Sequence, residues 1–546
     1  MSDTTSQKLL DIQNLSILLP DGADRRYAVE DISIDLSPGE TLCIVGESGS
    51  GKSLTARAVM GLLPGPKVRV GDGAINFLGE DTTKVTPERL RDIRGNEISM
   101  IFQEPMTALN PVMRIGDQID EIFRFHVSMP AKERAARALQ LLTDVNLPDP
   151  AGIMRAYPHE LSGGQRQRAM IAMALALEPK ILIADEPTTA LDVTTQAQIL
   201  KLIKELQQQH HTGVLFITHD FGVVADIADR VAVMQYGKLV EMGTVHEVLN
   251  APQHPYTKGL IAAIPKLKPR AAREQSKESV LSAHGVRKTF GSTGGFSLFG
   301  KKDRVVHAVN DVSIEVHRGE TLGIVGESGS GKSTMARCLI RLMDIDDGEI
   351  YVGDQEISKL DRKHMRPHRR RLQMVFQDPF ASLNPRIRVG QIIAQGPILQ
   401  GVDKEEANKR AKELISIVGL EESAFDRFPH EFSGGQRQRI GIARALALEP
   451  DILIADEPVS ALDVSIQAQI LELLDKIRKQ MNLSMVFITH DLRVAAQVCD
   501  RVAVMQYGKV VEIGPTAELF GDPQHDYTKA LLAAIPGKDW QTEDVA

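Results

Sequence analysis

The stretch GESGSGKS occupies residues 46–53, and the same eight letters return at 326–333. Each copy follows a short apolar run and leads into a helix-like pattern, LTARAVMGLL at 54–63 or TMARCLIRLM at 334–343. A glycine-rich turn between a strand and a helix lets main-chain amides converge on phosphate groups, while the lysine adds a positive charge. The two copies therefore predict two phosphate-binding sites rather than two simple glycine turns.

The composition is that of an ordinary globular protein with an acidic balance. The chain has 546 residues and a net charge of −8, and its length allows two to four domains. The acidic balance argues against a general electrostatic grip on nucleic acid. A local exception is RKHMRPHRRR at 362–371. We interpret this segment as a solvated face; lipid headgroups or a partner protein are the next alternatives, and nucleic acid is the last.

Membrane spans and secretory signals are not evident in the sequence. The longest apolar run, AMIAMALAL at 169–177, is far shorter than the ~20 residues that cross a bilayer. Residues 1–10 lack the apolar core of a signal peptide, so we expect a cytoplasmic protein. Cys43, Cys338 and Cys499 are too few and too scattered for a metal cluster or a disulfide framework, and we expect buried, reduced thiols.

An internal repeat sets the domain organisation. Ser162, Glu186 and His219 recur after an offset of 271 residues, whereas the phosphate loops are offset by 280. The nine extra residues fall within the Gly/Ser-rich segment 290–304, where insertions are tolerated. The repeat predicts two domains, over 1–265 and 280–546, joined by a linker over 266–279. The linker is charged and poor in large apolar groups, so we expect a flexible coil whose ends lie roughly 20 Å apart.

The apolar pattern within each half predicts an α/β fold with a mainly parallel sheet. KILIADEP (180–187) and DILIADEP (451–458) are apolar on both faces, as buried parallel strands are, and GVLFITHD (213–220) and SMVFITHD (484–491) repeat that form. Ligands of such sheets gather at the carboxyl ends of the strands. We therefore expect the Asp-Glu pairs, the histidines and the phosphate loops to meet there.

Between these strands the pattern changes to helices. In KERAARALQLLTDV (132–145), Leu139, Leu142 and Val145 fall at helical spacing. We interpret them as the core of a small helical lobe and not as a cofactor site.

Five landmarks stand in one order in each half: GESGSGKS, FQEP or FQDP, LSGGQRQR or FSGGQRQR, LIADEPTTALD or LIADEPVSALD, and ITHD. This series resembles the nucleotide-binding domain of ABC transporters, and the resemblance covers nearly the whole chain twice. It implies, in each half, a RecA-like P-loop core with a helical subdomain and a small antiparallel β part. It also implies that the chain is an ATPase that uses ATP and Mg²⁺.

The resemblance assigns roles to individual residues. Lys52 and Lys332 would bind the β- and γ-phosphates. The remaining ATP-binding residues of the phosphate loops would be Gly46, Ser48, Gly49, Gly51 and Ser53, with Gly326, Ser328, Gly329, Gly331 and Ser333. The Mg²⁺ site would comprise Ser53, Gln103 and Asp185, with Ser333, Gln377 and Asp456. The catalytic residues would be Glu186 and Glu457, which orient the attacking water, and His219 and His490, which contact the γ-phosphate.

The SGGQ stretch gives a reason for two phosphate loops in one chain. In the resembling family this motif binds the γ-phosphate held by the opposite domain, so that two domains enclose two ATP molecules head to tail. Site one would join Lys52, Gln103, Glu186 and His219 to Ser433, Gly434, Gly435 and Gln436. Site two would join Lys332, Gln377, Glu457 and His490 to Ser162, Gly163, Gly164 and Gln165. Both sites have every landmark, so we expect two competent sites.

The adenine contact differs between the halves. Tyr27 stands where the family keeps an aromatic residue that stacks on adenine, and His307 holds the matching position in the second half. Imidazole stacks more weakly, so the base contact of the second site is less well defined. Packing in the core is the alternative role for both side chains.

The ends of the two halves point to transport. APQHPYTKGLIAAIP (251–265) and DPQHDYTKALLAAIP (522–536) resemble the tail of ATPases of the oligopeptide, dipeptide and nickel import family. Neither is followed by the cysteine cluster that holds iron and sulfur in many relatives. The fused arrangement is most similar to the ATPase of microcin C and peptide importers, and a glutathione-type importer is a close competitor.

The resemblance also implies partners and a location. The stretches EPMTALNP (104–111) and DPFASLNP (378–385) would lie near the groove that receives a permease helix. We expect two membrane permease subunits and an extracytoplasmic solute-binding protein as partners, no nucleic acid and no iron-sulfur cluster. The protein would be peripheral, on the cytoplasmic face of the inner membrane. The alternative is a soluble tandem ATPase that acts on ribosomes or nucleic acid, which the short linker and the scattered cysteines disfavour.

Overall fold

The computed structural model describes residues 8–188, 191–271, 273, 276–291, 305–460, 462–538 and 540. The chain forms two compact units. The first unit comprises residues 1–191, 195–263 and 536–546, and the second comprises 192–194 and 264–535. The predicted insertion within 290–304 falls almost wholly outside the described residues. The domain boundaries at 265 and 280 stay predictions.

The first half of the chain alternates strands and helices. Its strands are β1 (Leu10–Leu18), β2 (Tyr27–Leu36), β3 (Thr41–Val45), β4 (Arg69–Phe77), β5 (Glu80–Asp81), β6 (Ile98–Ile101), β7 (Ile181–Asp185), β8 (Gly213–Ile217), β9 (Arg230–Gln235) and β10 (Lys238–Thr244). Its helices are α1 (Lys52–Val59), α2 (Pro87–Ile93), α3 (Pro105–Ala108), α4 (Ile115–His126), α5 (Ala131–Asp144), α6 (Pro150–Arg155), η1 (Pro158–Glu160), α7 (Gly163–Ala174), α8 (Val193–His210), α9 (Phe221–Ile227), α10 (Val245–Asn250) and α11 (Pro255–Ala262).

The second half repeats this order. Its strands are β11 (Ser279–Phe290), β12 (Val306–His317), β13 (Thr321–Val325), β14 (Asp347–Val352), β15 (Gln355–Glu356), β16 (Leu372–Val375), β17 (Ile452–Asp456), β18 (Ser484–Ile488), β19 (Arg501–Gln506) and β20 (Lys509–Pro515). Its helices are α12 (Lys332–Leu339), α13 (Arg362–Arg371), α14 (Pro379–Ser382), α15 (Val389–Leu399), α16 (Lys404–Ile417), η2 (Glu422–Asp426), η3 (Pro429–Glu431), α17 (Gly434–Leu446), α18 (Val464–Met481), α19 (Leu492–Val498), α20 (Thr516–Gly521) and α21 (Asp526–Ala533).

Each unit contains a six-stranded sheet that carries the phosphate loop. The strand order is β10-β9-β3-β8-β7-β6 in the first unit and β16-β17-β18-β13-β19-β20 in the second. Five strands of each sheet run parallel, and the edge strand β10 or β20 is antiparallel to its neighbour. Strands β3, β7 and β8 and their counterparts are buried throughout, which confirms the predicted α/β fold with a mainly parallel sheet.

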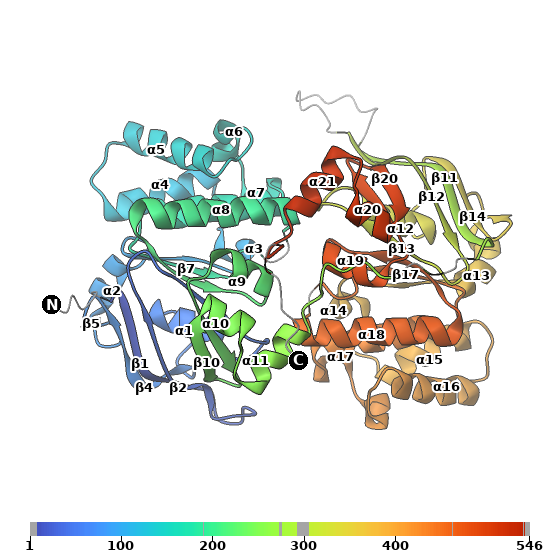
Figure 1. Ribbon diagram of the computed structural model, residues 1–546, viewed down its shortest axis with the longest axis horizontal. Coiled ribbons are helices and arrows are strands. Elements are labelled where there is room, and N and C mark those ends of the chain that lie inside the picture. The colour runs from blue at the N-terminus through green and yellow to red at the C-terminus, as the bar shows by residue number, and fades with distance from the viewer. Residues whose placement is uncertain are drawn as a thin grey trace. The chain divides into compact units, whose positions relative to one another are not determined.

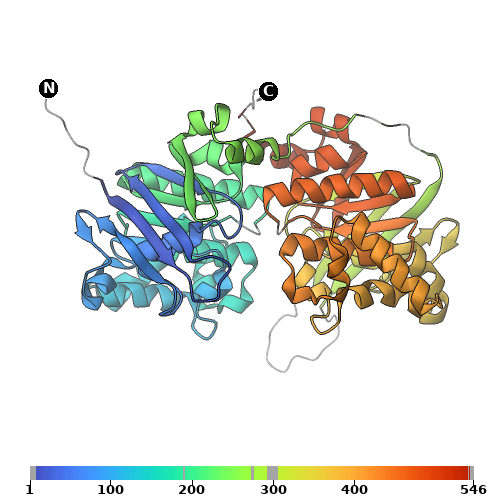
Figure 2. The ribbon, with the colours of Figure 1, turned by 90° about the horizontal axis from the view of Figure 1, so that it is seen from below.

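A four-stranded antiparallel sheet and a group of helices complete each unit. The antiparallel sheets have the orders β2-β1-β4-β5 and β12-β11-β14-β15. Figure 1 shows β1, β2 and β4 at one end of the first unit and α4, α5 and α6 at the other, with the six-stranded sheet between them. In the second unit α18 packs over the six-stranded sheet, where Leu474 and Ile477 join the same core as Leu453 and Phe487 (Figure 2). The predicted helical and antiparallel β parts are therefore both present.

The prediction for the helical lobe is correct in part. Leu142 in α5 is fully buried, and Val145, which follows the helix, is 4% exposed, as predicted for the core of this lobe. Leu139 is 39% exposed, so its assignment to the core is wrong. The helix turns Ala138 and Leu141 inward instead, which places Leu139 on the outer side of the same helix.

The cysteines and the basic segment have ordinary structural settings. Cys43, Cys338 and Cys499 are free and buried, as predicted, and burial raises the pKa of the Cys338 thiol to about 11. The basic segment 362–371 forms α13, which buries Met365 and His368 and leaves most of its cationic side chains in solvent. This arrangement supports a solvated face. No helix in the described part of the chain has the length and apolarity needed to cross a membrane.

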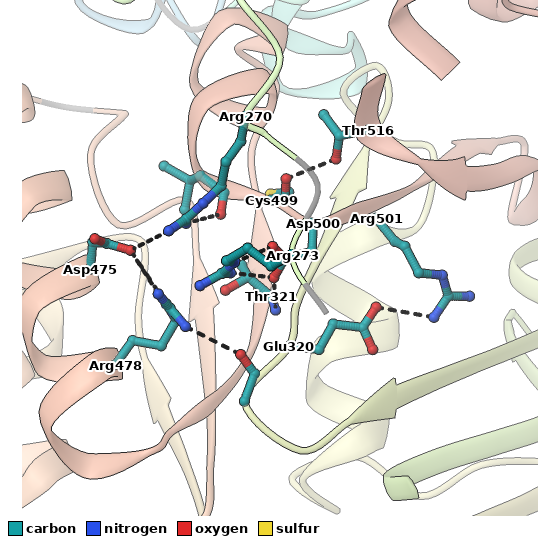
Figure 3. Close-up of polar contacts among 12 residues, drawn as sticks. Arg270, Arg273, Glu320, Thr321, Asp475, Arg478, Cys499, Asp500, Arg501 and Thr516 are labelled. Carbon is teal, nitrogen blue, oxygen red and sulfur yellow. Dashed lines mark hydrogen bonds and ion pairs between the residues drawn. The ribbon is translucent and has the colours of Figure 1, made fainter. Parts of the chain in front are cut away.

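The linker is anchored to the second unit by two arginines (Figure 3). Arg273 Nε donates to Asp500 Oδ1 at 2.7 Å, and its Nη2 pairs with the other oxygen of the same carboxylate. Arg270 Nη2 donates to Asp475 Oδ1 at 3.0 Å, and Arg270 N donates to the carbonyl of Ala496 at 2.8 Å. The expectation of a flexible coil is therefore wrong for these two positions, because each bonds to a carboxylate more than 200 residues away.

Replacing Arg273 by glutamine should lower the free energy of unfolding of the second unit by about 2–3 kcal/mol. The Asp500 carboxylate is only 4% exposed and also accepts the amide of Thr321 at 2.8 Å, so the variant leaves a buried charge without its paired cation. Urea denaturation would measure the loss. The control is Arg287→Gln, whose pair with Asp311 is exposed and should contribute less than about 1 kcal/mol. Equal effects in the two variants would contradict the prediction.

The stability that Asp475 contributes should depend on pH. Burial alone would raise the pKa of this carboxyl, but hydrogen bonds from Lys479, Arg478 and Arg270 outweigh burial and lower the pKa well below the ordinary value of 3.8. The contribution is fully present above pH 3.8 and is lost as the pH falls through the lowered pKa. Asp475→Asn should therefore destabilise the protein at neutral pH by about 1–2 kcal/mol. The difference from wild type should narrow on acidification, and a constant difference would refute the prediction.

Candidate functional site

The phosphate loop of the first unit depends on glycines at two points of close approach. Gly46 and Gly51 have φ of 148° and 104°, which disfavour other residues. A Cβ atom on Gly46 would lie 2.2 Å from the carbonyl oxygen of Met234, and one on Gly51 would lie 2.8 Å from that of Ala28. The loop therefore packs closely against the main chains of β9 and β2. The second unit repeats the arrangement at Gly326 and Gly331.

The loop lysines are held inside their own loops. Lys52 Nζ donates to the carbonyl oxygens of Gly46 and Glu47 at 2.7 and 2.9 Å. Lys332 Nζ bonds to the matching carbonyls at 2.7 and 2.8 Å. Burial lowers the pKa of Lys332, and the carboxylate of Glu457 counteracts this effect. Each ammonium group thus lies within the loop, where it can exchange carbonyl oxygens for phosphate oxygens.

A hydroxyl and a buried carboxyl face each other beside each loop. Ser53 Oγ donates to Asp185 Oδ1 at 2.8 Å, and Ser333 Oγ donates to Asp456 Oδ1 at 2.9 Å. The two aspartates are 1% and 2% exposed, and burial raises the pKa of both. A nearby divalent cation would favour the ionised form of such a carboxyl. Two hard oxygen donors at one point fit Mg²⁺, which binds carboxylate, hydroxyl and water oxygens.

The predicted catalytic glutamate links the glutamine and the histidine of each unit. In the first unit Gln103 Nε2 donates to Glu186 Oε2 at 2.9 Å, and His219 Nδ1 lies 3.4 Å from Glu186 Oε1. In the second unit the distances from Gln377 and His490 to Glu457 are 3.0 and 3.1 Å. The structure therefore brings together the three side chains that follow different strands of each sheet, as the sequence predicts.

The backbone and the charge of this glutamate are both unusual. Glu186 and Glu457 have φ of 47°, a left-handed conformation that non-glycine residues adopt at a cost of about 1–3 kcal/mol. Burial would raise the pKa of Glu457, but the hydrogen bond and charge of His490 lower it overall. Burial acts in the opposite direction on His490, whose pKa is nevertheless raised by the same partner. The carboxylate stays ionised and can accept a hydrogen bond from water.

The SGGQ motifs lie at the start of α7 and α17. Ser162 Oγ accepts from Gln165 N at 3.3 Å, and Gln165 Oε1 accepts from Ser162 N at 2.9 Å, which forms a capping box. Ser433 and Gln436 form the same box. Ser162 is exposed, so the helix N-terminus is accessible to an anion. The roles of both motifs in composite sites stay predictions.

The predicted adenine positions lie beside the phosphate loops. Tyr27 begins β2 and is half-buried, with the guanidinium of Arg26 5.2 Å from its ring centroid. His307 is exposed, and its Nδ1 lies 3.1 Å from Thr289 Oγ1. The residue after each one abuts the last glycine of the loop through its carbonyl oxygen. Neither side chain is buried in the core, and their contact with adenine stays a prediction.

Two tyrosines that the sequence analysis did not select also contact the phosphate loops. Tyr256 Oη accepts a hydrogen bond from Glu47 N at 3.1 Å, and Tyr527 Oη accepts one from Glu327 N at 3.1 Å. The signal was available, because HPYTK and HDYTK recur at the offset of 271. The repeat alone does not indicate which group each tyrosine hydroxyl contacts.

Two family models match both halves of the chain. Residues 29–189 and 309–460 match the ABC transporter family, and residues 240–290 and 511–544 match the oligopeptide/dipeptide transporter C-terminal region. The chain is 49% identical over 536 residues to the peptidoglycan transport ATP-binding protein YejF of Agrobacterium fabrum, which covers 98% of this chain and 97% of YejF.

Similar values are found for a second group of relatives. The chain is 46% identical over 565 residues to the glutathione import ATP-binding protein GsiA of Salmonella paratyphi A, over 98% of this chain and 90% of that protein. The identity to GsiA of Escherichia coli O157:H7 is also 46%, over 97% and 89% of the two chains. With both cassettes matched and both phosphate loops built alike, the chain belongs to the ABC transporter family, as an ATPase with two fused cassettes of the peptide-importer type.

Proposed function

We propose that this chain powers the import of peptides or peptide-like compounds through separate membrane permease subunits. The observation that carries the proposal is the pairing, in both units, of a complete Gln-Glu-His set with an oligopeptide-type tail. Two relatives are named for import or transport of glutathione and peptidoglycan, compounds that contain peptide bonds. The chain would act on the cytoplasmic face of the inner membrane, with an extracytoplasmic solute-binding protein as the further partner.

The two ATP sites would each be shared between the units. Site one would combine Lys52 and Glu186 with the motif that begins at Ser433. Site two would combine Lys332 and Glu457 with the motif that begins at Ser162. The capped, exposed N-termini of α7 and α17 support this assignment, because such a terminus attracts the negative charge of a γ-phosphate.

Within a site, each side chain would have a distinct task. The loop lysine would exchange its two carbonyl partners for phosphate oxygens. Its positive charge would then offset the negative charge of the phosphates. Ser53 and Asp185, with Gln103, would hold Mg²⁺, which supplies further charge neutralisation. Glu186 would orient and polarise the attacking water, and His219, whose Nδ1 lies 3.4 Å from this carboxylate, would contact the γ-phosphate. The second unit offers the same set through Ser333, Asp456, Gln377, Glu457 and His490.

The test is to extract the protein from native membranes in mild detergent and identify what co-purifies in fixed proportion. Two multi-span permease subunits, together with a solute-binding protein, are expected. A control extraction with a Glu186→Gln, Glu457→Gln variant should retain the same partners, because the change affects hydrolysis and not docking. Ribosomal proteins or nucleic acid in place of a permease would refute the proposal.

A further inference from the structure

The segment after the six-stranded sheet of each unit reaches back to that unit's phosphate loop. Tyr256 in α11 contacts Glu47, which lies 209 residues earlier, and Tyr527 in α21 contacts Glu327 over 200 residues. In both cases the tyrosine hydroxyl accepts the main-chain amide of the second loop residue at 3.1 Å. The same hydrogen bond forms in both units, between the same atoms and at the same distance, so it is a repeated feature of the fold.

A carboxylate fixes the turn that carries the first tyrosine. Glu241 of β10 accepts the amide of Gln253 at 2.6 Å and the amide of His254 at 3.1 Å, one on each oxygen. His254 Nδ1 then accepts the amide of Tyr256 at 3.2 Å and caps α11. The position of the hydroxyl is therefore set by β10, which belongs to the same sheet as the phosphate loop.

The second unit has the same chain of bonds. Glu512 of β20 accepts the amides of Gln524 and His525 at 2.8 and 3.1 Å, and His525 Nδ1 accepts the amide of Tyr527 at 3.1 Å. Burial would raise the pKa of Glu512, but these and other hydrogen bonds lower it overall, so the carboxylate remains charged. Tyr527 is 9% exposed, and burial raises its pKa, which keeps the phenol neutral.

The tyrosine and the lysine hold opposite sides of one peptide group. Lys52 Nζ bonds to the carbonyl oxygen of Gly46, and Tyr256 Oη bonds to the amide of Glu47, which belongs to the same peptide plane. If the lysine turned to a phosphate, it would give up this carbonyl. The tyrosine bond would then remain as a polar restraint on the peptide, next to a glycine whose φ of 148° other residues rarely adopt.

We propose that Tyr256 and Tyr527 are positioning residues that keep the phosphate loop in its ATP-binding shape once the lysine has left its carbonyl partners. Both tyrosines fall within the regions that match the oligopeptide/dipeptide transporter C-terminal region. The tail of this chain thereby sets the ATP affinity of its own cassette. The proposal rests on ATP binding and not on the nature of the cargo.

The test is the double variant Tyr256→Phe, Tyr527→Phe in the full-length chain. Phenylalanine keeps the ring packing and removes the hydroxyl that accepts the loop amide. Loss of one neutral hydrogen bond corresponds to about a 5-fold change, so we expect the Kd for ATP and the KM to rise about 5-fold with little change in kcat. Binding of a fluorescent ATP analogue and steady-state hydrolysis would measure these values.

The chain provides matched controls. Tyr236 and Tyr507 are also related by the offset of 271, but they are 74% and 81% exposed in the turns between the last two strands of each sheet. Tyr236→Phe with Tyr507→Phe should leave the Kd unchanged. Glu512→Gln, which weakens the turn without touching the tyrosine, should raise the Kd in the same direction by a smaller factor.

Two results would overturn the proposal. The first is a wild-type Kd in the Tyr256→Phe, Tyr527→Phe variant. The second is an equal rise in the exposed-tyrosine control. A lower melting temperature together with the unchanged Kd of the first result would assign the bond to stability alone. Because co-purification tests the cargo and partners separately, failure here is distinguishable from failure of the proposed import function.

Discussion

Replacing both Glu186 and Glu457 by glutamine should lower kcat for ATP hydrolysis about 10³-fold and leave the Kd for ATP within a few-fold of wild type. The amide keeps the shape and hydrogen bonds of the side chain but cannot accept a proton or stabilise a developing hydronium charge. The low pKa of Glu457, set by His490 against the effect of burial, supports an ionised carboxylate as the active form. Steady-state phosphate release, with nucleotide binding measured on the same samples, would test this expectation.

The control for this change is Glu178→Gln with Glu449→Gln. These glutamates are also 271 residues apart and have φ of 52° and 51°, so backbone strain and charge loss are matched. Their side chains are exposed and pair with Arg137 and Arg410. Activity in the control should be close to wild type. If either single variant, Glu186→Gln or Glu457→Gln, retained near wild-type ATPase activity, the expectation of two competent sites would be wrong.

The proposed pairing of the half-sites predicts a large difference between two double variants. Glu186→Gln with Ser433→Arg changes both halves of site one and leaves site two intact, so residual ATPase activity should persist. Glu186→Gln with Ser162→Arg damages both sites, and its activity should fall at least about 100-fold below that of the other pair. Phosphate release at saturating ATP would compare the two proteins.

The serine-to-arginine substitutions require a separate control variant. Each one removes a helix cap, which costs about 1 kcal/mol and is the same for α7 and α17. Glu186→Gln with Ser423→Arg, at an exposed serine outside both motifs, gives the activity of a protein with one damaged site. Equal activity of the Ser162 and Ser433 pairs would show that each SGGQ motif does not serve the opposite phosphate loop.

Local pattern was enough to predict the elements that carry the site. The phosphate loop, the apolar strands that end in Asp185 and Ile217, and the residues just beyond them are short, contiguous signals. In a parallel sheet such strands end at one edge, so Gln103, Glu186 and His219 had to meet. The sheet topology therefore brings three residues that are far apart in the sequence into one group of contacting side chains.

Contacts between distant segments escaped the sequence analysis for a physical reason. Tyr256 lies on a helix whose apolar pattern gives no indication of what its hydroxyl meets 209 residues earlier. Arg270 and Arg273 lie in a charged segment whose composition is typical of a coil. Their fixed positions result from bonds to Asp475 and Asp500, which only the folded second unit brings within reach. Leu139 illustrates a smaller error, since helical spacing alone did not indicate which side of α5 is buried.

The anchored linker changes where the chain can be divided. Judged from the sequence motifs, the second cassette starts near β11 at Ser279. A fragment that begins there would keep every nucleotide-binding motif of the second half. Such a fragment would lack Arg270 and Arg273 and would expose the nearly buried carboxylate of Asp500, which also holds the first residue of β13. A stable second half should therefore begin at or before Ile264, where the compact unit itself begins.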